Sequence, residues 1–322
     1  MLRVLEVTFP VFALVFCGFL GQRHHLLPEK AVDGLNAFVF FFALPAMLFR
    51  IVAAQSPASL SDARFALGYA ATGMAVFAFT RWAALPGRGT PAPRASVERS
   101  QASAFALSAT HGNVGYLGVP LVLELGDRFM PPLILVVVCD IFIAITLAIV
   151  LLELEQRRRQ GSSAGAALLP TVLRSFAGSP LVLALAAGLA LTTTGARLPA
   201  VMENFVRILS SAAGPCALFA IGASLGDRRI LLSGAVRSLV AIKLVAHPAL
   251  AAIVLFGIVR AEPLAASVGV LAASLPAASS SFIIARRYDV DGREIGSAIL
   301  AGTFAALVTV STVIWVLGMK RG

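Results

Sequence analysis

Residues 111–126 read His-Gly-Asn-Val-Gly-Tyr-Leu-Gly-Val-Pro-Leu-Val-Leu-Glu-Leu-Gly. This stretch places an asparagine, several glycines and Pro120 inside a run that is otherwise apolar enough to cross a membrane. Glycine and proline interrupt helices, and hydrocarbon tolerates the freed N–H and C=O groups only where the broken segment is buried in protein or lines a cavity. Interrupted helices of this kind form substrate sites in secondary transporters. We therefore expect this segment to be a discontinuous helix that lines a site.

The composition indicates a membrane protein. Of the 322 residues, 58% are hydrophobic and 13% are charged, and the mean hydropathy is +0.89. A soluble domain has about 25% charged residues. The net charge of +10 comes largely from arginines clustered between apolar runs, where they orient the chain and meet anionic headgroups. We therefore expect an all-α polytopic protein that contacts the lipid bilayer and does not bind nucleic acid.

The cysteines give no sign of a metal site. Cys17, Cys139 and Cys216 all lie within apolar runs and lack metal-ligand spacing, so we expect packing roles and no metal or cofactor. Arg3 precedes a first apolar run, as in a signal peptide, but the following Gly21-Gln22-Arg23 offers no small-x-small cleavage site. We expect this run to be a retained helix.

Apolar runs of membrane-spanning length predict ten transmembrane helices. Their approximate bounds are 4–21, 32–54, 64–85, 101–124, 131–152, 170–193, 200–225, 234–258, 263–286 and 294–318. Pro86–Ser100 is expected to be a flexible loop. The odd-numbered loops carry 16 Lys and Arg, against 9 for the termini and the other loops, which places the odd-numbered loops in the cytoplasm and both termini outside.

Two halves resemble each other at an offset of 170 residues. The matched pairs are Pro10 with Pro180, Gly18 with Gly188, Pro45 with Pro215, and Phe49 with Phe219. Coincidence is the alternative, because small residues and prolines are common in membrane helices. Leu275-Pro276-Ala277-Ala278-Ser279-Ser280-Ser281 adds a second interrupted run, in the ninth span. Five spans in each half require the halves to be inverted, so the interrupted fourth and ninth helices should cross near the midplane, where half-helix N-termini can hold an anion.

This pattern gives a domain division. We expect residues 1–152 to form the first five-helix repeat, 153–169 a cytoplasmic linker that includes Arg157, Arg158 and Arg159, and 170–322 the second repeat.

Asn113 through Leu121 resembles the first crossover of the auxin efflux carrier family, which includes plant PIN-formed auxin transporters and bacterial carriers of malate- or malonate-like dicarboxylates. Leu275 through Tyr288 resembles the second crossover, and Ala213 through Leu225 the seventh helix. The resemblance covers nearly the whole chain. It implies a fold like that of bile-acid symporters, with scaffold and transport domains each drawn from both repeats, an elevator-type alternating-access mechanism, a bacterial inner (plasma) membrane location and a possible homodimer through scaffold helices.

The resemblance also implies a substrate site at the crossing, where Asn113 contacts a carboxylate. Around it we expect the substrate to meet Gly112, Val114, Gly115, Pro276, Ala277, Ser279, Ser280 and Ser281. Gly112 and Ser281 stand where plant relatives usually carry prolines, and the serines stand where bacterial relatives often carry asparagine. These departures leave the substrate open between auxin-like and dicarboxylate anions.

Ionisable groups deep in a span are costly and therefore informative. Asp140 and Lys243 are the clearest cases, and His247 follows Lys243 by one helical turn. They form either a structural ion pair between Asp140 and Lys243 or a proton-coupling or substrate-charge site. His111 flanks the break, where it either contacts substrate or caps the helix. Sodium coupling would need several oxygen ligands, and the sequence places no cluster of acids near the midplane. Proton coupling or uniport is therefore favoured.

These observations favour a secondary transporter of a small organic anion over the alternatives. An intramembrane enzyme would need a reactive set, such as Ser279 to Ser281 with His247, and the spacing does not support one. We expect no catalytic residue. A channel is a further alternative, which saturation and counterflow would distinguish from a carrier.

Overall fold

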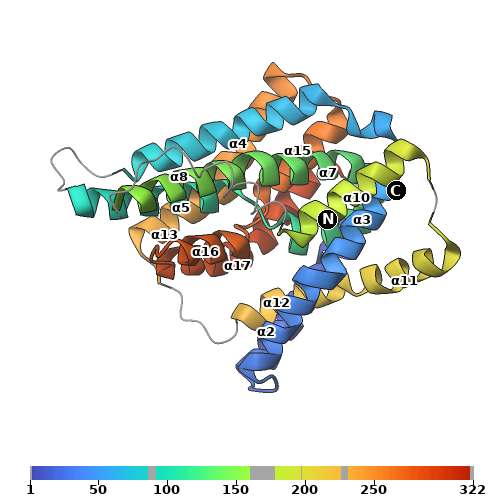
Figure 1. The fold of residues 1–322 in the computed structure, drawn as a ribbon, viewed down its shortest axis with the longest axis horizontal. Coiled ribbons are helices and arrows are strands. Elements are labelled where there is room, and N and C mark those ends of the chain that lie inside the picture. The colour runs from blue at the N-terminus through green and yellow to red at the C-terminus, as the bar shows by residue number, and fades with distance from the viewer. Residues whose placement is uncertain (1, 86–91, 160–177, 197, 226–230, 320–322) are drawn as a thin grey trace.

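The computed structural model describes residues 2–85, 92–159, 178–196, 198–225 and 231–319, which form helices joined by short connections (Figure 1). The first part of the chain contains α1 (Leu2–Arg23), α2 (Glu29–Phe38), η1 (Val39–Ala43), α3 (Leu44–Ala53), η2 (Pro57–Leu60), α4 (Ala63–Ala83), α5 (Ala92–Thr110), η3 (Val114–Gly118), α6 (Val119–Leu125), η4 (Asp127–Phe129), α7 (Met130–Cys139), η5 (Asp140–Ile145) and α8 (Thr146–Arg159).

The second part contains α10 (Pro180–Thr194), α11 (Ala200–Ser211), α12 (Ala213–Leu225), α13 (Gly234–Ala241), η6 (Ile242–Ala246), α14 (His247–Ala252), η7 (Ile253–Ile258), α15 (Pro263–Ser274), α16 (Ser279–Arg287) and α17 (Arg293–Val316). The described residues form no β-strand, and their single β-bridge joins Gly112 to Ala277. The expected all-α class is therefore confirmed.

Five continuous helical segments among the described residues are long and apolar enough to cross a membrane. They are Lys30–Ala53, Asp127–Arg159, Ala200–Ser224, Gly234–Ile258 and Arg293–Val316. These correspond to the expected second, fifth, seventh, eighth and tenth spans. Shorter apolar helices cover Phe9–Arg23, Val114–Leu125, Pro180–Thr194 and Pro263–Ser274. The protein is thus a multi-pass membrane protein.

Two expected connections are more helical than the sequence suggests. In the expected loop Pro86–Ser100, α5 already begins at Ala92, and residues 86–91 lie outside the described part. In the expected linker 153–169, α8 continues through Arg159, and residues 160–169 also lie outside it. Ion pairs explain the extension of α8, because Glu153 bonds Arg157 within the helix and Glu155 bonds Arg99 of α5.

Short π-helical turns precede three prolines. η1 ends just before Leu44-Pro45, η3 just before Val119-Pro120, and η6 just before His247-Pro248. Proline has no N–H to donate and its ring crowds the preceding turn, so a wider turn on its N-terminal side lets the helix continue through it. The helical segments Lys30–Ala53, Val114–Leu125 and Gly234–Ile258 therefore each continue through their proline.

Two helix pairs come into unusually close contact through glycine. α1 packs on α12, where a Cβ built on Gly18 would lie 2.0 Å from the carbonyl oxygen of Phe219. α10 packs on α3, where a Cβ built on Gly188 would lie 3.0 Å from the carbonyl oxygen of Phe49. Both contacts require a residue without a side chain. They are related by the 170-residue offset, because Gly18 matches Gly188 and Phe49 matches Phe219.

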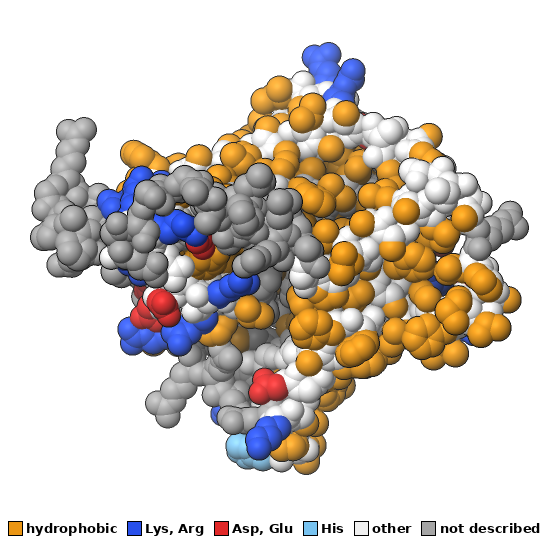
Figure 2. All heavy atoms as spheres, viewed as in Figure 1, with side chains coloured by type: hydrophobic (Ala, Val, Ile, Leu, Met, Phe, Trp, Pro, Cys, Tyr) orange, Lys and Arg blue, Asp and Glu red, His pale blue; other side chains and the backbone are white. Residues whose placement is uncertain are grey.

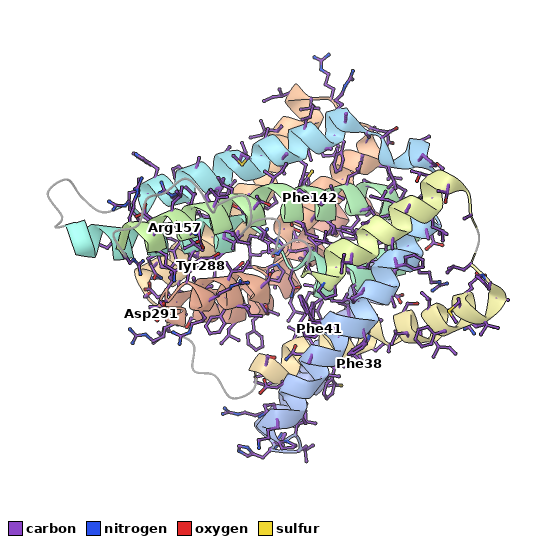
Figure 3. The ribbon with its side chains drawn as sticks, viewed as in Figure 1. Phe38, Phe41, Phe142, Arg157, Tyr288 and Asp291 are labelled. Atoms are coloured by element: carbon purple, nitrogen blue, oxygen red, sulfur yellow. The ribbon has the colours of Figure 1, made fainter. Side chains whose placement is uncertain are left out.

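The helices form two groups in Figure 1. Helices α3, α10, α11 and α12 occupy the right and lower part of the view, with α1 packed on α12, whereas α5, α8, α13, α16 and α17 occupy the left part and α4 runs across the top. Apolar side chains cover much of the visible surface, whereas Lys and Arg gather at its edges (Figure 2). Arg157, Tyr288 and Asp291 lie at the left end, where α8 and α16 finish and α17 begins (Figure 3).

Candidate functional site

Two interrupted helices meet inside the protein. One interruption separates α5, which ends at Thr110, from η3, which begins at Val114. The other separates α15, which ends at Ser274, from α16, which begins at Ser279. We call residues 111–113 and 275–278, which lie between these helices, the joint.

Backbone hydrogen bonds connect the two sides of the joint reciprocally. The N–H of Asn113 donates to the carbonyl oxygen of Pro276 at 2.8 Å, and the N–H of Ala278 donates to that of His111 at 3.1 Å. They form the antiparallel bridge between Gly112 and Ala277. Interrupting a helix frees backbone groups that must be paired when buried. Here each interruption satisfies groups that the other one frees.

Gly112 is required by close packing. A Cβ at this position would lie 3.0 Å from the carbonyl oxygen of Ala272 and 3.3 Å from Lys243 Nζ. Pro276 contributes from the other side, because it cannot donate the N–H that would continue α15. The sequence therefore breaks both helices where their backbones come together.

Asn113 is buried, with 5% of its surface exposed, and caps η3. Its Oδ1 accepts a hydrogen bond from the N–H of Tyr116 at 3.3 Å. Within the part of the chain that the structure describes, its Nδ2 makes no hydrogen bond, so this amide donor is available to a ligand. Val114 and Gly115 form the first turn that follows the cap.

Three serines form the first turn of α16. Ser279 is exposed, Ser280 is half-buried and Ser281 is fully buried. Among the described residues, Ser281 Oγ has no hydrogen-bond partner. The first N–H groups of a helix have no intrahelical acceptor and carry partial positive charge. N–H groups and hydroxyls thus gather at the start of α16, next to the joint.

A hydrogen-bonded chain of side chains crosses the joint. His111 Nδ1 lies 3.2 Å from Asp140 Oδ2, and His111 Nε2 lies 3.1 Å from Ser280 Oγ. The hydroxyl of Tyr69 donates to Asp140 Oδ1 at 3.5 Å. Asp140 begins η5 and has 4% of its surface exposed. The carboxylate expected to be important is therefore connected to the start of α16 through His111.

Lys243 stabilises the end of α15 next to the joint. This fully buried side chain donates to the carbonyl oxygen of Ala273 at 2.8 Å, and its Nζ lies 3.2 Å from His247 Nδ1. The last carbonyls of a helix lack partners and attract cations, so Lys243 satisfies the broken end of α15. One of the two alternatives for Lys243 was an ion pair with Asp140. Among the described residues these two form no ion pair, and Asp140 pairs with His111 instead.

A large cavity lies away from the joint. Its volume is about 570 Å³, and it lies among α1, α3, α6, α7, α11 and α12, with Arg50, Glu124 and Asp127 among its polar lining residues. Asn113 and the serines of α16 do not line it, although Pro120 of α6 does. A second hollow of about 10 Å³ lies beside Tyr69, Thr110 and Asp140 and has room for about one water.

Sequence reasoning located the two interruptions but missed the role of His111. The residues that the structure brings to the joint are Gly112, Asn113, Val114, Gly115, Pro276, Ala277, Ser279, Ser280 and Ser281, with Asp140 reached through His111 and Lys243 reached through Ala273. His247 lies one step further away, behind Lys243. The only signal that could have found the missed contact is that His111 directly precedes a break.

Comparison with known proteins indicates a membrane transporter. The chain matches the family described as membrane transport protein over residues 3–315. It is 29% identical over 319 residues to a Rhizobium meliloti (strain 1021) protein named "Putative malonate transporter", covering 98% of this chain and 97% of that protein. It is 26% identical over 312 residues to "Uncharacterized transporter YfdV" of Escherichia coli (strain K12), covering 95% of each.

A third relative is longer. The mouse "Lysosomal cholesterol signaling protein" is 24% identical over 230 residues, which cover 68% of this chain and 26% of that protein. Because the family match extends over nearly the whole chain, this protein is a membrane transporter that belongs to the membrane transport protein family, the family of the auxin efflux carriers.

Proposed function

We propose that this protein is a secondary carrier that moves a small organic anion across the membrane and binds it at the joint. The observation that carries the proposal is the reciprocal backbone bridge between the two interruptions, next to the free amide donor of Asn113. A discontinuous helix pair presents half-helix N-termini and unpaired amides to an anion. A continuous helix offers neither.

The substrate contacts follow from the donors present. Asn113 Nδ2 donates to a substrate carboxylate, and the hydroxyls of Ser279, Ser280 and Ser281 with the first N–H groups of α16 complete the cradle. Gly112, Val114, Gly115, Pro276 and Ala277 shape its backbone. The buried, unpartnered Ser281 Oγ supports this assignment, because a hydroxyl buried without a partner costs about 1–3 kcal/mol. A ligand oxygen would remove that cost.

The second part of the proposal is an inverted repeat of ten membrane-spanning segments. Residues 1–152 and 170–322 form its halves, and residues 153–169 form a cytoplasmic linker. Its support is the matched pair of glycine contacts, Gly18 on Phe219 and Gly188 on Phe49. In a two-fold arrangement a contact between one position of the first half and one of the second must occur twice, with the halves exchanged. The reciprocal bonds of the joint have the same form.

The two helix groups suggest how transport occurs. We assign α1, α3, α10, α11 and α12 to a scaffold, and the group around the joint to a transport domain that moves against it as an elevator. The cavity of about 570 Å³ supports this division, because it lies between scaffold helices and α6 and α7, which follow the joint in the chain and which we place in the transport domain. Exposed apolar side chains on α11, such as Val201, Phe205 and Ile208, offer a surface for a homodimer.

The orientation proposed from the charge asymmetry places the Arg-rich end of α8 in the cytoplasm and both termini outside, in a bacterial inner membrane. Arg157 and the loop before α17 lie at that end (Figure 3). The large cavity then lies toward the extracytoplasmic side, where Arg50 can attract an anion.

The substrate class is proposed from the relative named as a malonate transporter: a small dicarboxylate, with an auxin-like anion as the alternative. Proton coupling is proposed to involve Asp140. Lys243 and His247 act on it indirectly, because both are engaged in holding the broken end of α15.

The test uses the full-length protein in liposomes. Radiolabelled malonate uptake should saturate and show counterflow, which a channel does not show. Asn113→Ala should lower uptake at limiting malonate, while Asn204→Ala, at an exposed asparagine of α11, should leave it unchanged. Absence of counterflow for malonate, acetate and indole-3-acetate alike would refute the carrier proposal.

One observation favours a second candidate, an intramembrane hydrolase. Ser280, His111 and Asp140 lie in the order of a nucleophile, a base and an orienting carboxylate. A serine-reactive fluorophosphonate probe distinguishes the two functions. Covalent labelling of Ser280 that is lost in His111→Gln would support the hydrolase, and the carrier requires none.

A further inference from the structure

In the chain Ser280–His111–Asp140, the direction of the hydrogen bonds depends on where the protons lie. An ionised carboxylate only accepts hydrogen bonds, so His111 Nδ1 must carry the hydrogen that faces Asp140. In neutral imidazole the other nitrogen, Nε2, is then an acceptor. The hydroxyl of Ser280 must donate to it, and that hydroxyl hydrogen is not available to a substrate.

One added proton reverses the bond to Ser280. If the proton resides on His111, both ring nitrogens are donors, and Nε2–H donates to Ser280 Oγ. If it resides on Asp140, the carboxylic acid donates to Nδ1, and the ring's single hydrogen moves to Nε2, which again donates to Ser280. Both protonated forms leave the Ser280 hydrogen free to turn toward a ligand.

We propose that the Asp140–His111 pair is a one-proton switch that makes Ser280 a donor to the substrate anion, so that the anion and one proton bind together at the joint. This inference rests on the proposed function and specifies its coupling. The added proton contributes in two ways: it cancels the negative charge of the pair close to the cradle, and it releases a hydroxyl hydrogen at the first turn of α16. Both effects favour an anion.

The surroundings of the pair are compatible with this role. Facing groups that titrate or carry charge are Tyr69 from α4, Cys139 from α7, and Lys243 and His247 from η6 and α14. Lys243 Nζ and His247 Nδ1 contact each other, and Lys243 also donates to Ala273, so neither makes a hydrogen bond to the pair. Tyr69 donates to the Asp140 oxygen that His111 does not use.

A small hollow lies at the far end of the chain. The hollow of about 10 Å³ is lined by Asp140, Tyr69 and Thr110 and has room for about one water. A water there can pass a proton to Asp140, from which it is shared with His111. Ser280, half-buried, is at the other end of the chain, on the substrate side. Proton and anion therefore reach the pair from different sides.

Linkage makes the inference measurable. If anion binding takes up a proton, the anion's affinity must fall as the pH rises, by at most about tenfold per pH unit for one proton. Binding of the anion must also remove protons from the buffer. His111→Gln provides a non-titrating comparison, because an amide can donate to Asp140 and accept from Ser280 and so imitates the unprotonated state.

The experiment measures malonate binding to the purified full-length protein by calorimetry between pH 6 and pH 8. Each pH is repeated in two buffers of different ionisation enthalpy, which counts the protons taken up. Malonate's own ionisation affects all variants equally, so the quantity compared is the ratio of wild-type to His111→Gln affinity. His24→Gln, at an exposed histidine after α1, is the matched control.

We expect the ratio to fall by about tenfold or more from pH 6 to pH 8, and wild-type protein to take up more protons than His111→Gln by as much as one per malonate. His24→Gln should behave like wild type. A constant ratio, or equal proton uptake by wild type and His111→Gln, would overturn the switch while leaving the carrier intact. If wild type binds none of malonate, acetate and indole-3-acetate, the proposed function fails first. Thermal unfolding verifies that each variant is folded, and Ser280→Ala, which removes only the hydroxyl, should reduce the pH dependence in a protein with an unaltered pair.

Discussion

Asn113 has two separate tasks in the structure, and two substitutions separate them. Its Oδ1 caps η3 by accepting from Tyr116, while its Nδ2 has no partner among the described residues. Asn113→Ala removes both groups. Loss of a cap costs about 0.5–2 kcal/mol, and the 3.3 Å distance places this one near the lower end. Loss of a hydrogen bond to a carboxylate costs about 1.5–3 kcal/mol, so malonate affinity should fall by about 10- to 150-fold.

Asn113→Asp retains the cap and reverses the second task. Aspartate is as good a cap as asparagine, so the free energy of unfolding should stay within about 0.5 kcal/mol of wild type. The donor is replaced by a carboxylate oxygen that repels an anion, so malonate binding should be lost. A stable protein that does not bind is the specific expectation for a residue that faces substrate.

The assay is thermal unfolding of the purified variants in detergent, together with calorimetric malonate binding at one pH. Asn204→Ala is the control for a general effect of removing an asparagine. Wild-type affinity in Asn113→Asp would refute the placement of the substrate at the joint. Equal destabilisation by Ala and Asp would show that the cap does not explain the stability of this turn.

Three further changes address the supports of the joint. Asp140→Asn should leave malonate uptake with only the pH dependence of malonate's own ionisation and cost under about 1.5 kcal/mol of stability, because an amide can still bond both neighbours; a larger loss, measured by thermal unfolding, would show that the charge itself holds the fold. Lys243→Met should destabilise the protein by about 1–3 kcal/mol, because it leaves a buried carbonyl unpaired, whereas Lys30→Met, at an exposed site, should have no effect. Gly18→Ala should cost about 1–3 kcal/mol or more by separating α1 from α12, against no loss in Gly34→Ala, where no atom lies within 4 Å; equal melting temperatures would contradict the close packing.

Local chemistry explains why the sequence predicts both interruptions. Glycine at 112 and proline at 276 disfavour a helix whatever surrounds them, so the break can be inferred without knowing its partner. The glycine contacts of α1 and α10 are also visible in the sequence, as the matched pair Gly18 and Gly188. What the pattern does not contain is the distance of approach, which depends on how two distant helices pack.

The ends of the helices were harder to predict. Ala92–Ser100 contains Pro93, three charged residues and two serines, which resembles a loop in composition. The structure extends α5 through it, because proline is tolerated in a first turn and Arg99 finds Glu155 on α8. A tertiary ion pair, which no local window contains, decides where this helix begins.

The chain of side chains across the joint shows the same limit more clearly. Asp140 was identified from its depth in an apolar run and His111 from its position beside a break, and each observation admits several roles. Their contact spans 29 residues, and the contact between His111 and Ser280 spans 169. The sequence identifies polar groups whose burial costs free energy, but only the fold determines which of them pair with one another. Lys243 illustrates the consequence: its charge, read alone, suggested a partner for Asp140, whereas the broken end of α15 provides the acceptor. A buried cation next to an interrupted helix should therefore be tested against the free carbonyls of that helix before it is assigned to an acid or to a substrate.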